Sequence, residues 1–299
     1  MMNHFLRHGL CLLLLLGLLV SGGGLTAFAE DEADIVIEEE LEEEAGPHEI
    51  RVYADGLLGA RAYDDGDDIY LPLENLCSLL GFDCVCEQDS ESGVLFVSAY
   101  GLHLEADPEE DYFSVNGRYV YNPTGFPTID GHICIPVEAA ARVFSLDWSL
   151  SEDRGELDLD LSHMDVLYGS ASYYSDTYGS DNVFWLIRII NAEATHQPLD
   201  GRIGVGNVVL NRVDSDMYPD NIYDVIFDYQ FGVQFEPAYN GRIYLEPNEL
   251  SEIAAYLCLE GYNTVGESMF FVCPFVADDT WFRLGRTYVT SLGAHDFYA

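Results

Sequence analysis

The sequence predicts an α+β protein in which a secretory signal peptide precedes a small duplicated α+β module and a second, mostly helical α+β domain. An apolar run near the N-terminus has the layout of an export signal. A strand–helix–strand pattern occurs twice between residues 48 and 161, and helical apolar periodicity begins near residue 181. A chain of 299 residues, 48% of them hydrophobic, is long enough for two domains with separate cores.

Residues 1–29 have the three parts of a signal peptide. Arg7 precedes an apolar run from Leu10 to Val20, and Ala27-Phe28-Ala29 provides small residues for cleavage before Glu30. The alternative is a membrane anchor, but the run has only about half of the roughly 20 residues that a spanning helix needs. No second long apolar run follows. We therefore expect a secreted protein with no membrane segment after signal cleavage.

The charge of the chain is strongly acidic, with 12 Lys and Arg against 53 Asp and Glu and a net charge of −41. This balance excludes a nucleic-acid partner, because phosphate binding needs a basic surface. Part of the acidity lies in residues 30–47, where consecutive glutamates repel one another and predict a disordered linker. The alternative for this segment is a calcium-binding tail, but it lacks the Asp/Gly pattern of calcium loops.

Six cysteines follow the signal peptide. An exported chain with an even number of cysteines permits disulfides, but several of these residues occupy apolar positions, where buried free thiols are equally compatible with the pattern. No cysteine spacing matches a zinc site, and His48, His103 and His132 are scattered singly. The six residues are Cys77, Cys84, Cys86, Cys134, Cys258 and Cys273.

A strand, a short helix started by proline and a second strand recur between residues 48 and 161. Each copy follows an Asp-Gly pair, Asp65-Gly66 or Asp130-Gly131, which is typical of a hairpin turn. Proline is tolerated at a helix start because the N–H there has no helical partner. The corresponding segments are Ile69–Glu74 and Ile133–Glu138, Leu79–Cys84 and Val143–Trp148, and the closing strands 94–97 and 156–159. This module resembles the copper amine oxidase N-terminal-like domain of exported Gram-positive proteins. That resemblance implies a spacer or wall-adhesion module without copper chemistry.

The second domain is expected over residues 181–299, after a polar linker at 162–180. A helix should begin near Ser180-Asp181, because apolar residues recur at helical spacing from Val183 to Ala194. Glu193 falls at the edge of this apolar stripe. Loss of hydration there should raise its pKa, so that the carboxyl keeps a proton near neutral pH, as a general acid must. The alternative is a structural glutamate bound to a backbone N–H or an arginine.

Several linked motifs surround Glu193. They are Ala192-Glu193-Ala194, Val205 to Val213 with Asn211-Arg212-Val213, Tyr218-Pro219, Val225-Ile226, Gln234-Phe235 and His295-Asp296-Phe297-Tyr298. Their order and spacing resemble the SleB/CwlJ family of cell wall hydrolases, over about 120 residues. Members typically continue the first motif with Arg, Gly and Glu, where this chain has Thr195, His196 and Gln197. These departures leave the acid in place and put the substrate preference in question.

The resemblance implies a lysozyme-like α+β fold and cleavage of peptidoglycan glycan strands, with Glu193 as the general acid/base and no metal or cofactor. It also suggests Gln234, Asn211, Arg212 and Tyr298 as substrate-binding residues, although each has a structural alternative. A glycosidase needs a second carboxylate, and the sequence identifies none. A lytic transglycosylase does not need one, because the muramic C6 hydroxyl attacks the anomeric carbon.

Two other functions remain open from the sequence. A peptidoglycan amidase or peptidase needs zinc ligands or a Cys/His pair, and this domain offers His163, His196 and His295 in no recognisable spacing. A wall- or spore-coat-binding protein with a decayed active site would explain the changed residues at 195–197. The expected partner is peptidoglycan in each case.

Overall fold

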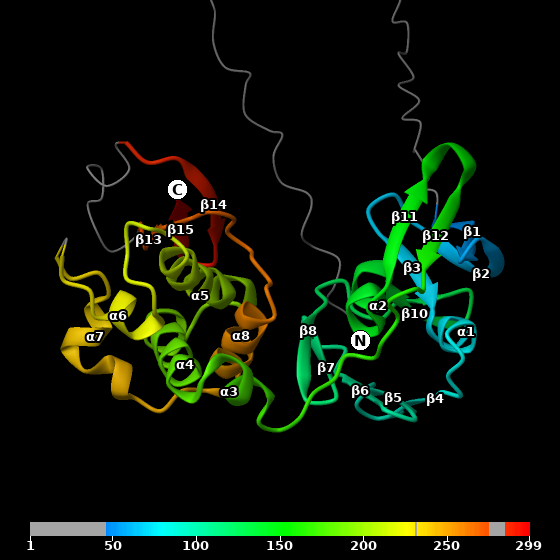
Figure 1. Ribbon diagram of the computed structural model, residues 1–299, viewed down its shortest axis with the longest axis horizontal. Coiled ribbons are helices and arrows are strands. Elements are labelled where there is room, and N and C mark those ends of the chain that lie inside the picture. The colour runs from blue at the N-terminus through cyan, green and yellow to red at the C-terminus, as the bar shows by residue number, and fades with distance from the viewer. Residues whose placement is uncertain (1–45, 231, 275–284) are drawn as a thin grey trace, which may run out of the picture. The chain divides into compact units, whose positions relative to one another are not determined.

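The computed structural model of the chain describes residues 46–230, 232–274 and 285–299 (Figure 1). The predicted signal peptide and nearly all of the acidic linker lie outside the described residues. The described helices and strands form an α+β protein, as the sequence predicts. No helix among these residues combines the length and apolar character needed to cross a membrane.

A seven-stranded sheet organises the first module, in the order β11-β12-β1-β2-β3-β10-β9. Its strands are β1 (His48–Ala54), β2 (Leu57–Asp64), β3 (Ile69–Pro72), β9 (Thr128–Ile129), β10 (His132–Pro136), β11 (Asp147–Ser151) and β12 (Glu156–Asp160). The β1–β12 pair is parallel and the other pairs are antiparallel. The 3-10 turn η1 (Glu152–Arg154) joins β11 to β12.

Both predicted strand–helix pairs are present in this sheet. Pro72 ends β3 and precedes helix α1 (Leu73–Leu79), and Pro136 ends β10 and precedes helix α2 (Val137–Phe144). The two equivalent strands pair with each other, with Leu71 opposite Ile135. Asp130 and Gly131 both have positive φ in the predicted two-residue hairpin turn between β9 and β10, as such turns require.

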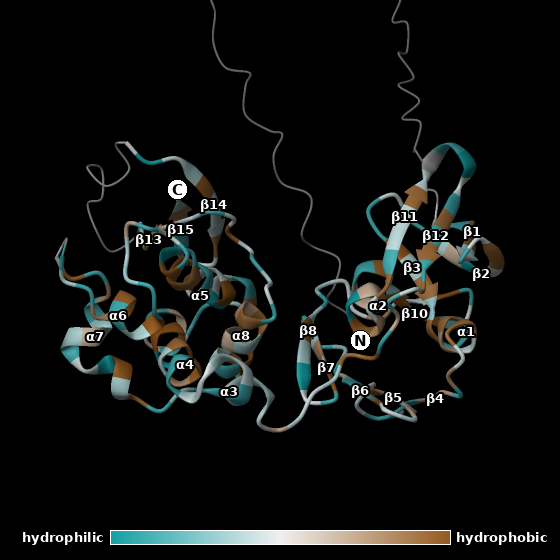
Figure 2. Ribbon diagram, viewed as in Figure 1, coloured by the Kyte–Doolittle hydropathy of each residue, from teal (hydrophilic) through white to brown (hydrophobic). Residues whose placement is uncertain are grey.

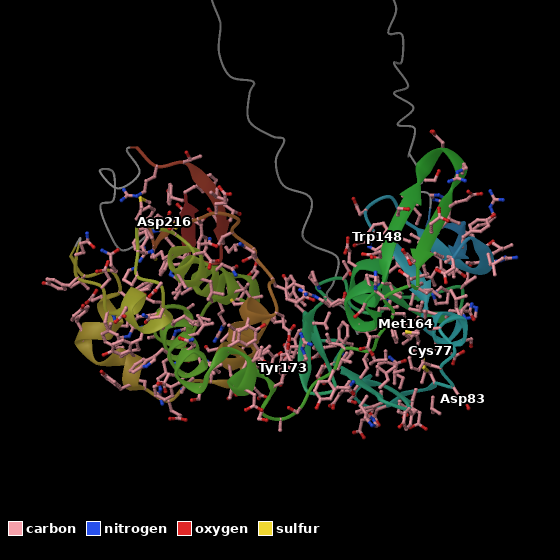
Figure 3. The ribbon with its side chains drawn as sticks, in the orientation of Figure 1. Cys77, Asp83, Trp148, Met164, Tyr173 and Asp216 are labelled. Carbon is pink, nitrogen blue, oxygen red and sulfur yellow. A yellow bond between two sulfur atoms is a disulfide. The ribbon has the colours of Figure 1, made fainter. Side chains whose placement is uncertain are left out.

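The two copies diverge after their helices. In the first copy the chain enters a separate antiparallel sheet in the order β4-β5-β6-β7-β8, whereas in the second it returns to the seven-stranded sheet. Its strands are β4 (Val85–Gln88), β5 (Leu95–Ala99), β6 (Leu102–Ala106), β7 (Tyr112–Val115) and β8 (Arg118–Tyr121). A Cys77–Cys84 disulfide links α1 to the segment before β4 (Figure 3). Cys134 and Cys258 are buried free thiols, so both outcomes left open by the sequence occur.

The segment predicted as a linker contains a short helix, α3 (Tyr173–Tyr178). The Tyr174 ring is buried and stacks on Tyr256 at 4.0 Å, and its hydroxyl donates to the Glu260 carboxylate. The Arg118 guanidinium forms an ion pair with the same carboxylate, whose side chain is only 2% exposed. These contacts explain why a polar, Tyr-rich stretch is ordered here, because each buried polar atom has a partner.

Three helices build the core of the second domain, namely α4 (Ser180–Ala194), α5 (Leu199–Val213) and α8 (Glu249–Leu259), which lie side by side in Figure 1. Apolar residues follow α4 and α5 in Figure 2. A Cβ on Gly206 would lie 2.5 Å from the Cys258 sulfur, so glycine allows α5 to approach α8 closely. The remaining elements are α6 (Ile222–Ile226), α7 (Glu236–Asn240), η2 (Arg242–Tyr244) and the sheet β13-β15-β14, formed by Phe270–Val272, His295–Tyr298 and Tyr288–Leu292.

Candidate active site

Glu193 lies in the last turn of α4, where the sequence analysis placed it. The predicted apolar stripe is buried at Val183, Leu186, Ile190 and Ala194, and packs into the core. Glu193 itself is half-buried at the edge of that stripe. Its position follows from helical geometry, because residues three and seven positions earlier lie on the adjacent buried face.

The electrostatic surroundings of Glu193 favour its protonated form. Burial raises the pKa of its carboxyl to about 7, with the nearby Arg242 guanidinium opposing this shift and the Glu236 carboxylate adding to it. Among the described residues, no hydrogen-bond donor or ion-pair partner holds the carboxyl. The loss of hydration on burial therefore outweighs the attraction of Arg242, and the carboxyl can carry a proton near neutral pH.

Glu236 and Arg242 are the two charged neighbours that sequence reasoning missed. Glu236 is exposed and begins α7, and Arg242 begins η2 and donates from Nη2 to the Ala192 carbonyl at 2.7 Å. Both belong to the segment that follows Gln234-Phe235, which the sequence analysis assigned no chemical role. Nothing in local periodicity indicates that this segment folds back onto the end of α4.

A buried polar network holds the chain on both sides of Glu193. Arg202, 4% exposed, donates to the carbonyls of Thr195 and Gln197 and to the side chains of Asn248 and Ser251. The Ser251 hydroxyl donates in turn to Asn191 Oδ1 at 3.2 Å. The guanidinium therefore satisfies carbonyls at the C-terminal end of α4 that have no helical donor.

The three departures from the family pattern occupy defined places around this network. The Thr195 hydroxyl donates to Asn191 Oδ1, and Gln197 Oε1 accepts from the backbone N–H of Ala294 at 2.7 Å. Gln197 thereby ties the start of α5 to the turn between β14 and β15. His196 is exposed. Thr195 and Gln197 thus both form hydrogen bonds that support the fold around Glu193.

The four residues suggested for substrate binding differ in their burial and in their hydrogen bonds within the domain. Asn211 donates to the carbonyls of Gly266 and Ser268, and Arg212 is buried, donates to the Met269 carbonyl and lies over the Phe235 ring. Tyr298 is 3% exposed in β15. Gln234 donates to the Gly232 carbonyl at 3.2 Å and is half-buried. The contacts of Asn211 match its structural alternative, an amide that ties helix to loop. The structural alternative for Arg212 is an ion pair, but among the described residues Arg212 binds a carbonyl and aromatic rings and forms no ion pair.

The surroundings of Glu193 offer no metal-binding group in the part of the chain that the structure describes. No three His, Cys, Asp or Glu side chains gather there in a way that could hold a metal ion. His295 is buried at the start of β15, and burial lowers the pKa of its imidazole. The charged groups that act on the Glu193 carboxyl are Arg242 and Glu236.

The raised pKa of Glu193 makes a prediction for stability. The pKa of this carboxyl rises from 4.5 to about 7 on folding. Its contribution to the free energy of unfolding is therefore fully present below pH 4.5 and is lost as the pH rises through 7. The loss amounts to about 3 kcal/mol. Glu193→Gln, which resembles the protonated acid, should therefore be more stable than the wild type at pH 8 and equally stable at pH 4. Urea unfolding at both pH values measures this difference, and equal stabilities at pH 8 would contradict it.

Comparison with known proteins finds relatives of the second domain. Residues 196–298 match the family model described as Cell Wall Hydrolase. The spore cortex-lytic enzymes of Bacillus subtilis (strain 168) and Oceanobacillus iheyensis are 27% and 28% identical over 120 residues, which cover 40% of this chain and 38% and 42% of those proteins. The chain thus spans less than half the length of these curated relatives.

Two solved structures are also similar to this chain. The catalytic domain of the germination-specific lytic transglycosylase SleB from Bacillus anthracis is 27% identical and covers 42% of this chain and 98% of that domain, with a TM-score of 0.38. The catalytic domain of Bacillus cereus SleB covers 40% and 90%, with a TM-score of 0.36. The family match begins three residues after Glu193 and leaves out the first module, whose resemblance to the copper amine oxidase N-terminal-like domain stays a prediction. The second domain of this chain is therefore similar to the cell wall hydrolase family and to the spore cortex-lytic enzymes of the SleB/CwlJ type.

Proposed function

We propose that this chain cleaves the glycan strands of peptidoglycan and that Glu193 is the general acid/base. The observation that carries the proposal is the half-buried Glu193 carboxyl, whose pKa of about 7 keeps a large fraction of it protonated at neutral pH. A general acid works best when its pKa lies near the working pH. The match to the cell wall hydrolase family and to spore cortex-lytic enzymes supports peptidoglycan as the substrate.

In the proposed reaction Glu193 gives its proton to the oxygen that links N-acetylmuramic acid to N-acetylglucosamine. The bond from that oxygen to the muramic C1 breaks through an oxocarbenium-like transition state. The muramic C6 oxygen then bonds to C1, and the Glu193 carboxylate takes the C6 hydroxyl proton. The product is a 1,6-anhydromuramic end, and the acid is regenerated.

Glu236 provides a second carboxylate near Glu193, which the sequence did not identify. A carboxylate in that position suits the activation of water, and would give a reducing end instead of the anhydro ring. Glu236 is exposed, whereas Glu193 is half-buried, so the two carboxyl groups differ in their access to water. We favour the transglycosylase route, and analysis of the product distinguishes the two.

The test is to incubate the mature chain with purified spore cortex and with vegetative peptidoglycan, and to identify the products by mass spectrometry. Anhydromuramic ends support the transglycosylase route, and reducing ends support hydrolysis assisted by Glu236. Free peptides would indicate an amidase, and unchanged peptidoglycan would indicate a wall-binding protein. The structural contacts of Thr195 and Gln197 count against a decayed site. We further propose that the protein acts outside the cell, at the wall or spore, with the first module as a spacer or wall-adhesion unit.

The charged neighbours of Glu193 predict opposite shifts in the pH profile. Removing the cation in Arg242→Gln should raise the pKa of Glu193, and removing the anion in Glu236→Gln should lower it. Because the acid must be protonated, kcat/KM declines as the pH rises through the pKa of Glu193. The midpoint of this decline should move to higher pH in Arg242→Gln and to lower pH in Glu236→Gln. We expect displacements of about half a pH unit. Profiles that move in the same direction would contradict this assignment.

A further inference from the structure

Six aromatic side chains form a continuous surface at the end of the second domain that carries α6 and α7. Trp185 contacts Tyr223 at 5.3 Å, Phe227 at 5.4 Å and Tyr244 at 6.3 Å, as measured between ring centroids. Phe227 then contacts Tyr239 at 6.4 Å, which contacts Tyr229 at 5.8 Å. We call these six residues the aromatic face.

The outer members of the aromatic face are exposed to solvent. The exposed fractions are 46% for Tyr223, 65% for Tyr229, 47% for Tyr239 and 62% for Tyr244. Trp185 and Phe227 are half-buried beneath them and hold the rings in edge-to-face contacts. The Tyr239 hydroxyl also donates to the Phe227 carbonyl at 2.8 Å. A contiguous, ordered set of exposed rings on a soluble domain typically marks a binding surface.

The aromatic face is continuous with the surroundings of Glu193. In η2, Arg242 binds the Ala192 carbonyl next to Glu193, and Tyr244, two residues later, contacts Trp185. Trp185 precedes Glu193 by two turns of α4, about 12 Å along the helix axis. The η2 segment therefore follows α4 from the acid towards the aromatic rings, so that one extended ligand can reach both.

We infer that the aromatic face binds the N-acetylated sugar rings of the glycan strand on one side of the cleaved bond. This inference rests on the proposed function, since it places the same substrate beyond Glu193. The C–H faces of pyranose rings pack against aromatic faces, and tyrosine hydroxyls at the rim can bond sugar hydroxyls and amides. Four of the six rings are tyrosines, which fits a ligand that is both apolar and polar. The net charge of −41 opposes an anionic lipid surface.

The test measures binding separately from cleavage, in the full mature chain carrying Glu193→Gln. The probes are the hexamer of β-1,4-linked N-acetylglucosamine, followed by calorimetry, and peptide-free glycan strands, followed by co-sedimentation. Tyr223→Ala and Tyr244→Ala should each weaken binding about five- to tenfold, as expected for truncation of aromatic anchors. Tyr244→Phe keeps the ring and should retain most of the affinity. Tyr168→Ala is the control, because Tyr168 is 75% exposed in the segment between the two domains and is not part of the aromatic face.

The outcomes separate this inference from the proposed function. Normal glycan binding by both alanine variants overturns the inference, even if the wild type cleaves peptidoglycan. Weakened binding in both variants supports it, even if the wild type yields no cleavage product. The inference is also overturned if the alanine variants lose affinity only for neutral phosphatidylcholine vesicles, which indicates a membrane surface. The same holds if they dissociate a dimer in gel filtration while glycan binding stays unchanged.

Discussion

Replacing Glu193 by glutamine should abolish glycan cleavage while leaving the domain folded. Glutamine keeps the size of the side chain and cannot donate a proton of suitable acidity, so the step that breaks the glycosidic bond loses its acid. General acid catalysis contributes about 10²- to 10⁴-fold to such reactions, and the same group is also the proposed base. We therefore expect a loss of kcat of about 10³-fold or more, measured as the release of soluble muramic ends from cortex peptidoglycan.

The matched control for this substitution is Glu252→Gln, on the neighbouring helix α8. Glu252 is exposed and accepts a hydrogen bond from the Tyr256 hydroxyl, so its loss should change activity little. Circular dichroism should show the same helix content for both variants. If Glu193→Gln retained more than a tenth of the wild-type rate, another residue would have to supply the proton and the proposed mechanism would be wrong.

The elements that local patterns define could be predicted from the sequence. The Asp130-Gly131 turn, the two proline-led helices and the helix that carries Glu193 are found within two residues of their predicted positions. In each case a short-range cause decides the structure: positive φ in the turn, a missing N–H at the helix start, or a buried stripe at helical spacing. Gly261 likewise has positive φ just after Glu260, the C-cap residue of α8, where glycine is favoured.

The parts that depend on long-range contacts could not be predicted. The ordered helix α3 rests on the contact of Tyr174 with Glu260, which lies 86 residues further along the chain. Glu236 and Arg242 lie near Glu193, and the aromatic face forms beside α4, only because α7 and η2 pack against α4. No periodicity in that segment indicates the pairing. Asn211 and Arg212 illustrate the reverse case: their motif matches the family, yet their donors are directed at carbonyls before β13.

The second large effect is expected at Arg202, which lies under the end of α4. Arg202→Met removes a buried charge. Burial lowers the pKa of the Arg202 guanidinium, which means that folding costs this group hydration. Methionine avoids that cost, so part of the stability lost with the hydrogen bonds is regained. The partly buried carbonyls of Thr195 and Gln197 and the fully buried Ser251 hydroxyl oxygen then lose this donor. Hydrogen bonds to charged groups are each worth about 1.5–3 kcal/mol. The unpaired acceptors therefore outweigh the relief, and unfolding should become easier by about 3 kcal/mol.

A matched arginine elsewhere separates this effect from the loss of any positive charge. Arg61 is 69% exposed and pairs with Glu49 at the surface, so Arg61→Met should cost less than about 1 kcal/mol. Arg202→Lys keeps the charge but loses the planar fork, so it should fall between the two in urea unfolding. Its activity is the sharper measurement. Because Thr195 and Gln197 lie two and four residues after Glu193, a folded Arg202→Lys should show a lower kcat with little change in KM. Wild-type kcat and stability in both Arg202 variants would mean that the end of α4 holds Glu193 without this network.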